Sequence, residues 1–154
     1  MKISQSGIDL IKGFEGLRLT PYKCESGVWT IGYGHTGGVD QSTSPITEKE
    51  AEELLKKDLK YFEKCVNNKD YAPQSLNQNQ FDALVSFAFN LGQGNLKELC
   101  NANYPPGKKT VNHIAQEITL YNKVRIGEKL VVSQILTNRR EKEKNLFIKP
   151  VGNS

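Results

Sequence analysis

The chain has 154 residues, of which 37% are hydrophobic and 25% charged, and this composition is typical of a folded globular protein rather than a disordered or membrane-spanning one. Its formal net charge of +4 is too small to predict a nucleic-acid partner, and no stretch interleaves basic with aromatic residues as a single-strand binding platform would. The length suits one compact domain or two small lobes that share a helix.

Cysteine usage and the N-terminal segment both favour a reducing compartment. Cys24, Cys65 and Cys100 are odd in number and widely spaced, whereas a secreted disulfide framework has an even and denser set. Because they show no CxxC or Cys/His ligand spacing, we expect no metal site. The opening MKISQSGIDLIKGFEG lacks the apolar run of a signal peptide, and no stretch has the length of a transmembrane segment. The sequence therefore predicts a protein that is made in the cytosol.

The first part of the chain predicts a helix followed by a hairpin. Apolar residues recur at helical spacing over residues 8–14, and Gly16 ends this helix. The segments LRLTPYK (17–23) and VWTIGYG (28–34) are short and rich in β-branched and aromatic residues. Turn residues 25–27 separate them, which favours a β-hairpin.

The rest of the chain predicts helices. The sequence TEKE at 47–50 is a capping box, and the apolar stripe behind it predicts a helix over residues 47–66. Further apolar patterns predict helices over residues 81–92, 95–101, 111–118 and 133–147. The predicted fold class is α+β, with a small β-hairpin lobe and helices in the majority.

Glu15 breaks the local pattern because it lies at the C-terminal end of the first predicted helix, between Phe14 and Gly16. The negative end of the helix dipole and an apolar neighbour both disfavour ionisation, so we expect a raised pKa for this carboxyl. A carboxyl that stays protonated near neutral pH can donate a proton to the leaving oxygen of a glycosidic bond. A solvated glutamate at a frayed helix end is the alternative interpretation.

The predicted hairpin brings Cys24 and Thr30 together. If residues 25–27 form the loop, Cys24 pairs with Val28, and Thr30 lies two residues further along the same face. We expect Glu15 to face this pair, which would place an acid on one side of a sugar ring and two water-holding groups on the other.

The segment at 14–36, FEGLRLTPYKCESGVWTIGYGHT, resembles the active-site segment of the phage-type lysozymes, glycoside hydrolase family 24. The family pattern is Glu, eight residues, Asp or Cys, five residues and Thr, which this chain matches at Glu15, Cys24 and Thr30. FNLG at 89–92 and NRREKEKNLF at 138–147 also resemble the family, so the resemblance covers nearly the whole chain.

This resemblance implies a lysozyme-like fold in one domain over residues 1–154. A β-lobe with the cleft at about 15–46 would be joined by a connecting helix at about 47–66 to a mainly helical lobe at about 70–150. The first helix would pack on the helical lobe.

The implied activity is that of an endolysin, a muramidase that hydrolyses the β-1,4 bond between N-acetylmuramic acid and N-acetylglucosamine in bacterial peptidoglycan and so lyses the host cell. The resemblance implies no cofactor and no metal. The expected protein is a monomer with no nucleic-acid partner and no stable membrane insertion. It would remain in the host cytoplasm until it is released to the wall, with a phage holin as the candidate partner for release.

By resemblance Glu15 is the general acid, Thr30 helps to position the attacking water, and Cys24 occupies the place usually taken by Asp. A thiol with an ordinary pKa of about 8.5 is mostly neutral at pH 7. Cys24 is therefore a weaker base, a thiolate nucleophile or a hydrogen-bonding partner for water, and the stereochemistry stays open. Oxidation of Cys24, or its pairing with Cys65 or Cys100, would make activity depend on reduction. Simple burial is the alternative for Cys65 and Cys100.

Tyr33, His35 and Asn90 are weaker candidates for substrate binding, because sugar sites use aromatic faces and polar side chains. Packing is the alternative for Tyr33, and a structural hydrogen bond is the alternative for His35. One rival function is a cysteine peptidase or amidase of the same wall, with Cys24 as nucleophile and His35 or His113 as base. The other rival is a non-catalytic module that binds the wall.

Overall fold

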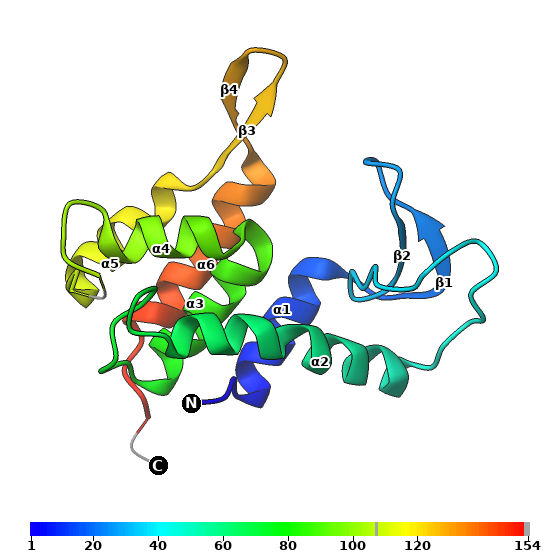
Figure 1. Ribbon diagram of the computed structural model, residues 1–154, viewed down its shortest axis with the longest axis horizontal. Coiled ribbons are helices and arrows are strands. Elements are labelled where there is room, and N and C mark those ends of the chain that lie inside the picture. Colours follow the sequence, from blue (N-terminus) through cyan, green and yellow to red (C-terminus); the bar gives the residue numbers. More distant parts are fainter. Residues whose placement is uncertain (107, 153–154) are drawn as a thin grey trace. The chain divides into compact units, whose positions relative to one another are not determined.

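The computed structural model describes residues 1–106 and 108–152 and divides the chain into two compact units. Unit 1 comprises Met1–Gly7 and Phe62–Ser154, and unit 2 comprises Ile8–Tyr61. Helices predominate, and two short antiparallel hairpins accompany them, so the predicted α+β class is confirmed (Figure 1). None of the helices in the described ranges is long and apolar enough to cross a membrane.

Unit 2 consists of two helical segments and one hairpin. Its elements are most of α1 (Gln5–Glu15), β1 (Arg18–Lys23), β2 (Trp29–Gly32) and the first part of α2 (Glu48–Asn67). The boundary with unit 1 falls inside both helices, because residues 5–7 of α1 and 62–67 of α2 belong to unit 1.

The β1–β2 hairpin has the predicted register. The backbone N–H of Cys24 donates to the Val28 carbonyl at 3.0 Å, and the N–H of Gly27 donates to the Cys24 carbonyl at 2.8 Å. Gly27 has a φ of +84°, which a residue with a Cβ rarely adopts. The loop is therefore 25–27, and the predicted pairing of Cys24 with Val28 is confirmed.

A tight turn follows β2. Ile31 and His35 exchange two backbone hydrogen bonds, each 2.9 Å long, so residues 32–34 form a closed turn. Gly32 adopts a φ of +68° there, and a Cβ added to it would lie 3.4 Å from the Ala51 Cβ of α2. The turn is thus packed against the helix that follows it in unit 2.

The capping box predicted for α2 forms as expected. The Thr47 N–H donates to the Glu50 carboxylate at 3.0 Å, and the Glu50 N–H donates to the Thr47 hydroxyl at 3.1 Å. Behind this cap Ala51, Leu55 and Leu59 are almost completely buried. Helical spacing therefore places the predicted apolar stripe in the core, as a packed amphipathic helix requires.

The grouping of residues 8–15 differs from the prediction, which assigned the whole first helix to the helical lobe. They group with unit 2, and only residues 1–7 group with the helical part of the chain. Lys12 of α1 pairs with Glu52 of α2, and its ammonium lies 5.5 Å from the centre of the Tyr33 ring. These contacts tie most of α1 to the turn and to α2, and sequence periodicity alone does not reveal them.

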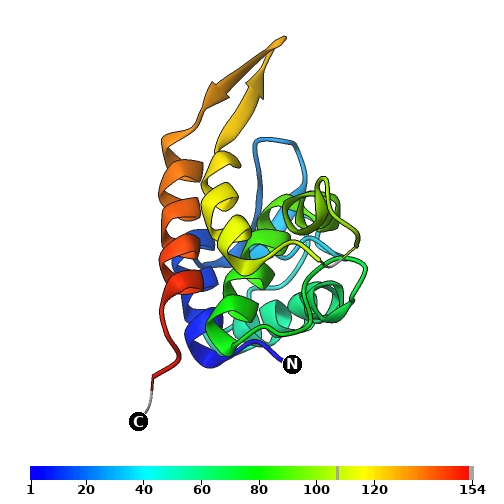
Figure 2. The same cartoon turned by 90° about the vertical axis from the view of Figure 1, so that its left-hand side faces the viewer.

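Unit 1 is mainly helical. Its remaining elements are α3 (Gln78–Leu91), α4 (Gln93–Asn101), α5 (Val111–Glu117), the 3₁₀ turn η1 (Ile118–Leu120), β3 (Lys123–Ile126), β4 (Lys129–Val132) and α6 (Gln134–Ile148). Residues 81–88 of α3 are all buried, and α3 packs along α6. Figure 2 shows α5 (yellow) beside α6 (orange to red) in this unit.

A buried carboxylate holds the start of α1 within unit 1. Asp82 of α3 is fully buried and accepts hydrogen bonds from the Ser4 backbone N–H at 3.0 Å, from the Ser4 hydroxyl and from the Gln78 amide at 2.8 Å. A Cβ added to Gly7 would lie 2.8 Å from the Asp82 Cγ, so this close approach requires glycine.

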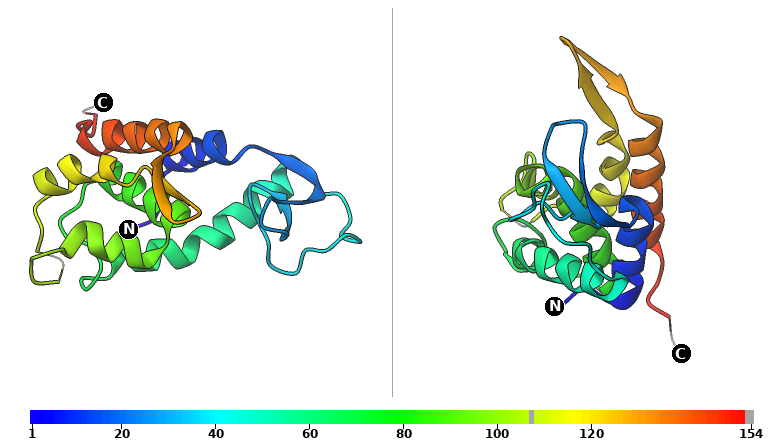
Figure 3. Two further views of the ribbon diagram at one scale, coloured as in Figure 1. Left: turned by 90° about the horizontal axis from the view of Figure 1, so that it is seen from above. Right: turned by 90° about the vertical axis from the view of Figure 1, so that its right-hand side faces the viewer.

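The β3–β4 hairpin is an element that the sequence patterns do not predict. All eight of its strand residues are exposed, so it lacks the alternation of buried and exposed residues that signals a strand. Gly127, with a φ of +62°, opens its two-residue turn. Seen from above, in the left view of Figure 3, this hairpin (gold) follows α5 and leads into α6.

Candidate functional site

Glu15 is the last residue of α1. The helix ends there because the Gly16 N–H donates to the Lys12 carbonyl at 3.0 Å while Gly16 takes a φ of +70°. The Glu15 side chain is half-buried, and a Cβ added to Gly34 would lie 3.2 Å from its Oε1. The carboxylate therefore lies against the tight turn at 32–34, on the same segment that carries Thr30.

Cys24 and Thr30 are brought together, as the register predicts. Tyr22 pairs with Thr30 and Cys24 pairs with Val28, so Cys24 and Thr30 are diagonal neighbours on one face. Thr30 is buried, and its hydroxyl donates to the Val28 carbonyl at 3.1 Å. This bond fixes the hydroxyl and leaves its lone pairs to accept from a water molecule.

Local hydrogen bonds lower the pKa of Cys24 to about 7. The largest cause is the Ser26 hydroxyl, whose oxygen lies 2.9 Å from the thiol sulfur, and backbone hydrogen bonds of Val28 and Ser26 add to it. The sequence predicted an ordinary thiol unless something lowered its pKa. Ser26 is that missing group, and its position two residues after Cys24 in a turn is the signal that could have indicated it.

Lys23 does not contribute to the Cys24 environment. Its ammonium lies 5.9 Å from the centre of the Trp29 ring, its cross-strand partner, on the opposite face of the strand from Cys24. The hydrogen-bond donors around the thiol, rather than a neighbouring cation, therefore stabilise its ionised form.

His35 is held at both ring nitrogens. Its Nδ1 lies 2.8 Å from the Asp58 Oδ2, and its Nε2 lies 2.9 Å from the Gly37 carbonyl oxygen. Both partners are hydrogen-bond acceptors within the protein, so both ring nitrogens are already engaged. This arrangement supports the structural alternative for His35. Asp58 was not singled out from the sequence, where it is one of several acidic residues in a charged helix.

Tyr33 and Asn90 have other partners. Tyr33 is buried, and the Lys12 ammonium covers its ring, so little aromatic surface is available to a sugar. Asn90 belongs to α3 of unit 1, and its Oδ1 accepts a 2.7 Å hydrogen bond from Arg140. Substrate binding by these two residues and by His35 stays a prediction.

The family-like segment NRREKEKNLF at 138–147 places a charged cluster in the core of unit 1. Glu143 is fully buried, 3.2 Å from Arg139 Nε and 2.7 Å from Arg140 Nε, and it accepts a hydrogen bond from the Ser86 hydroxyl. Burial raises the pKa of Glu143, and the two guanidinium groups oppose this effect. The family-like pattern at 138–147 is thus a structural network within unit 1.

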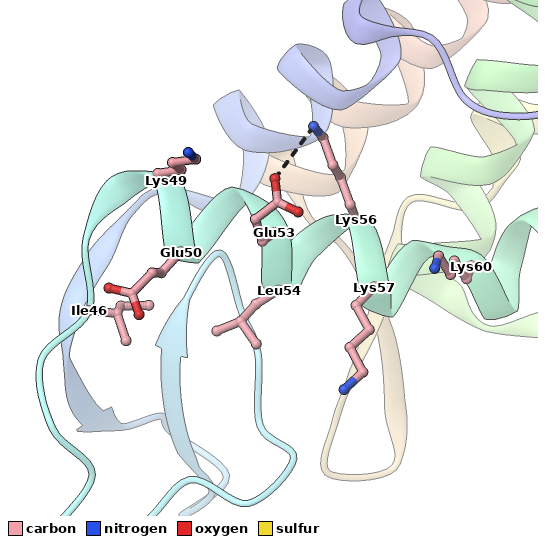
Figure 4. Close-up of a pocket in the computed structure, with 8 residues that line it drawn as sticks. All are labelled: Ile46, Lys49, Glu50, Glu53, Leu54, Lys56, Lys57 and Lys60. Carbon is pink, nitrogen blue, oxygen red and sulfur yellow. Dashed lines mark ion pairs between the residues drawn. The ribbon is translucent and has the colours of Figure 1, made fainter.

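The hollow along α2 is not the predicted catalytic site. It has a volume of about 800 Å³ and is lined by Ile46, Lys49, Glu50, Glu53, Leu54, Lys56, Lys57 and Lys60. Figure 4 shows Lys56 paired with Glu53, at 3.9 Å. None of Glu15, Cys24 and Thr30 lines this hollow.

The other cysteines lie in unit 1 and are buried, which supports the packing interpretation for both. Burial raises the pKa of Cys100 to about 12, so its thiol stays protonated. Cys65 is buried on α2. Within residues 1–106 and 108–152 no group of three metal-ligating side chains occurs. Redox control through Cys24 stays a prediction.

Comparison with known proteins identifies the family. The phage lysozyme family model matches residues 12–143, which include Glu15, Cys24 and Thr30. The chain is 44% identical over 149 residues to the endolysin of Bacillus phage PZA, covering 96% of this chain and 55% of that protein. It is 35% identical over 153 residues to the endolysin of Acyrthosiphon pisum secondary endosymbiont phage 1, covering 96% of this chain and 98% of that protein. The chain thus spans about half the length of the first relative and nearly all of the second.

The fold agrees with this match. The structure is similar to the muramidase domain of SpmX from Asticaccaulis excentricus, with a TM-score of 0.83, 36% identity, and coverage of 97% of this chain and 99% of that one. The predicted lysozyme-like fold is therefore confirmed. The family model spans most of the chain, and the fold and the motif spacing agree with it, so this chain belongs to the phage lysozyme family.

Proposed function

We propose that the chain is a muramidase that hydrolyses the β-1,4 bond between N-acetylmuramic acid and N-acetylglucosamine in bacterial peptidoglycan and acts as an endolysin. One observation carries the proposal. The β1–β2 register sets Cys24 beside Thr30 in the same unit as Glu15, whose carboxylate lies against the turn that follows Thr30. Family membership and relatives named endolysin or muramidase support the same substrate.

In the proposed reaction Glu15 protonates the glycosidic oxygen as the bond from that oxygen to the anomeric carbon breaks. A water molecule that donates to the Thr30 hydroxyl oxygen attacks the anomeric carbon and passes its proton to the Cys24 thiolate. Glu15 is then a carboxylate and Cys24 a thiol, and exchange of one proton with solvent restores both. The steps need only these side chains and water, without a cofactor.

The first test is product analysis in the presence of reductant. Purified protein is incubated with bacterial peptidoglycan, and new reducing sugar ends are quantified beside new free amino groups. We expect reducing ends without new amines. New amines without reducing ends would contradict the proposal and support the peptidase or amidase alternative, in which Cys24 is the nucleophile.

The Glu15→Gln variant tests whether Glu15 is the general acid. Removing the general acid should lower the rate by about 10²-fold or more, because the amide cannot protonate the leaving oxygen. Glu25→Gln is the matched control, since Glu25 is an exposed carboxylate in the hairpin loop. Wall binding that survives in Glu15→Gln, with no hydrolysis by the unmutated protein, would support the non-catalytic module instead.

The same proposal includes a monomeric enzyme that stays in the host cytoplasm until a holin opens the membrane. Sedimentation velocity tests the monomer. Lysis of cells that express the chain with and without a holin tests the release route.

A further inference from the structure

The β3–β4 hairpin exposes apolar side chains along its whole length. Of the fourteen exposed large hydrophobic side chains in the described part of the chain, seven lie between residues 120 and 135. They are Leu120, Val124, Ile126, Leu130, Val131, Val132 and Ile135. In Figures 1 and 2 the hairpin projects from one end of unit 1. Soluble proteins seldom leave such a concentration of apolar surface without an interaction that uses it.

Both faces of the hairpin carry apolar side chains. The cross-strand pairs are Lys123 with Val132, Val124 with Val131, Arg125 with Leu130, and Ile126 with Lys129. Because paired side chains share a face, one face carries Val124, Ile126, Lys129 and Val131, and the other carries Lys123, Arg125, Leu130 and Val132. Each face therefore combines aliphatic and basic side chains.

The hairpin is cationic as well as apolar. Its net charge is +2, because it contains three basic residues, Lys123, Arg125 and Lys129, and one acidic residue, Glu128. Among the described residues no carboxylate lies within ion-pair distance of these three cations. Their long stems allow the charges to remain at the level of lipid phosphates while the aliphatic neighbours enter the acyl region.

The chemistry of the hairpin argues against two other ligands. Residues 123–132 contain no aromatic side chain, and single-stranded nucleic acid is normally bound by stacking on such rings. Sugar rings are likewise held on aromatic faces. Aliphatic residues beside basic side chains instead match a surface with an apolar interior and negative headgroups.

We propose that the β3–β4 hairpin is a peripheral docking surface for a membrane leaflet rich in anionic phospholipid. Ile126 directly precedes the Gly127–Glu128 turn and Leu130 lies two residues after it, and they are 64% and 60% exposed, so the tip enters the interface first. Attachment is shallow and reversible, and it requires no spanning helix. It is independent of the proposed hydrolysis.

The experiment measures co-sedimentation of the full chain with vesicles of phosphatidylcholine alone and of equal parts phosphatidylcholine and phosphatidylglycerol, at low and raised salt. We expect binding to the anionic vesicles that weakens as salt rises. The double variant Ile126→Ser, Leu130→Ser should lower the partition coefficient at least about tenfold, because two aliphatic side chains no longer enter the interface. The variant Lys123→Gln, Arg125→Gln, Lys129→Gln should lower it similarly and remove most of the salt dependence.

Two further variants sharpen the test. Glu128→Lys should raise the partition coefficient at least about fivefold, because it replaces a repelled charge by an attracted one. The control Ile148→Ser, Val151→Ser removes two apolar side chains that are 56% and 48% exposed at the other end of α6 and beyond it, and should leave binding unchanged. All altered side chains are exposed, so thermal unfolding should match that of the unmutated protein.

Four outcomes would overturn the proposal. The first is equal binding to both kinds of vesicle, and the second is an equal loss in the control variant. The third is self-association of the chain that disappears in the apolar double variant, because the partner would then be a second copy. The fourth is loss of glycan hydrolysis in that variant with vesicle binding retained, because the hairpin would then serve the substrate.

Discussion

Cys24 stands where aspartate is the commoner residue of the active-site pattern. A thiol and a carboxyl differ in the pH at which they ionise. An ordinary aspartate is already ionised at a pH well below neutral, whereas an ordinary thiol is still mostly protonated at neutral pH. The Ser26 hydroxyl and the backbone hydrogen bonds lower the pKa of Cys24 from its ordinary value to about 7. About half of the molecules therefore carry the thiolate at neutral pH, which makes the proposed base workable there.

A pH profile tests this account of Cys24. The proposed base must be deprotonated, so the rising limb of the pH profile for hydrolysis should have its midpoint near pH 7, the lowered pKa of the thiol. In Cys24→Asp the same limb should move to about pH 4, because an aspartate ionises there. The rate of reducing-end formation is measured across pH. A profile that is identical in both proteins would show that Cys24 is not the base.

Ser26→Ala is the matched variant for the same profile. It leaves Cys24 in place and removes the largest cause of the lowered pKa, so the limb should move from about pH 7 toward the higher pH at which an ordinary thiol ionises. Ser42→Ala, in an exposed loop of the same unit, should leave the limb in place. An unshifted limb in Ser26→Ala would contradict the assigned cause.

Among the elements, those with a strong local signal could be predicted from the sequence. The α2 helix follows its capping box, and the hairpin register follows from the turn residues at 25–27. The β3–β4 hairpin was missed because it has no buried face, and a strand is recognised mainly by its alternation. Asp82 was missed because a carboxylate in the core depends on Ser4, a partner far away in the chain.

For the candidate site, the sequence was sufficient to place Cys24 beside Thr30, since hairpin spacing sets that neighbour relation. It could not predict the environment of each group. The contact between Glu15 and the turn at Gly34, and the bond between His35 and Asp58, both join segments that are separated along the chain. Such contacts are set by tertiary packing, which local patterns do not encode.

The stability of the turn after β2 should depend on the bond between His35 and Asp58. Asp58→Asn removes the carboxylate that is bonded to His35. We expect a loss of about 1–2 kcal/mol in the free energy of unfolding, less than for a fully buried bond because both side chains are partly exposed. Denaturant unfolding followed by Trp29 fluorescence measures this loss, since the only tryptophan lies in unit 2.

Glu53→Gln is the control for this change. Glu53 is exposed on the same helix, and its contact with Lys56 is 3.9 Å long, so its removal should cost less than about 0.5 kcal/mol. Equal losses in the two variants would mean that His35 and Asp58 form only a surface ion pair.

On the scale of the whole molecule, α1 and α2 each run without a break from one unit into the other. A helix propagates cooperatively once it is formed, so melting of one part of α1 or α2 destabilises the remainder. We therefore expect the two units to unfold in one transition, although each has its own buried residues.

The buried cluster around Glu143 tests this coupling. Glu143→Gln leaves the Arg139 and Arg140 guanidinium groups without their counter-charge in the core of unit 1, at a cost of about 3–5 kcal/mol. Thermal unfolding is followed by far-ultraviolet circular dichroism and by Trp29 fluorescence, which reports on unit 2. Both midpoints should fall together, and Glu141→Gln on the exposed side of α6 should change neither. A fall in the first signal alone would show that the units unfold separately.

The anchoring of Ser4 by Asp82 has a consequence for the order of folding. Unit 2 is one uninterrupted stretch, whereas unit 1 is complete only when residues 1–7 return to α3 across the length of unit 2. Closing a loop of that length costs about 3–4 kcal/mol in chain entropy while it is unstructured, and less once its residues are compact. Amide protons of unit 2 should therefore gain protection from exchange before those near Ser4 during refolding. The Ser4–Asp82 contact would then be among the last to form, so unit 2 is organised before unit 1 takes up residues 1–7.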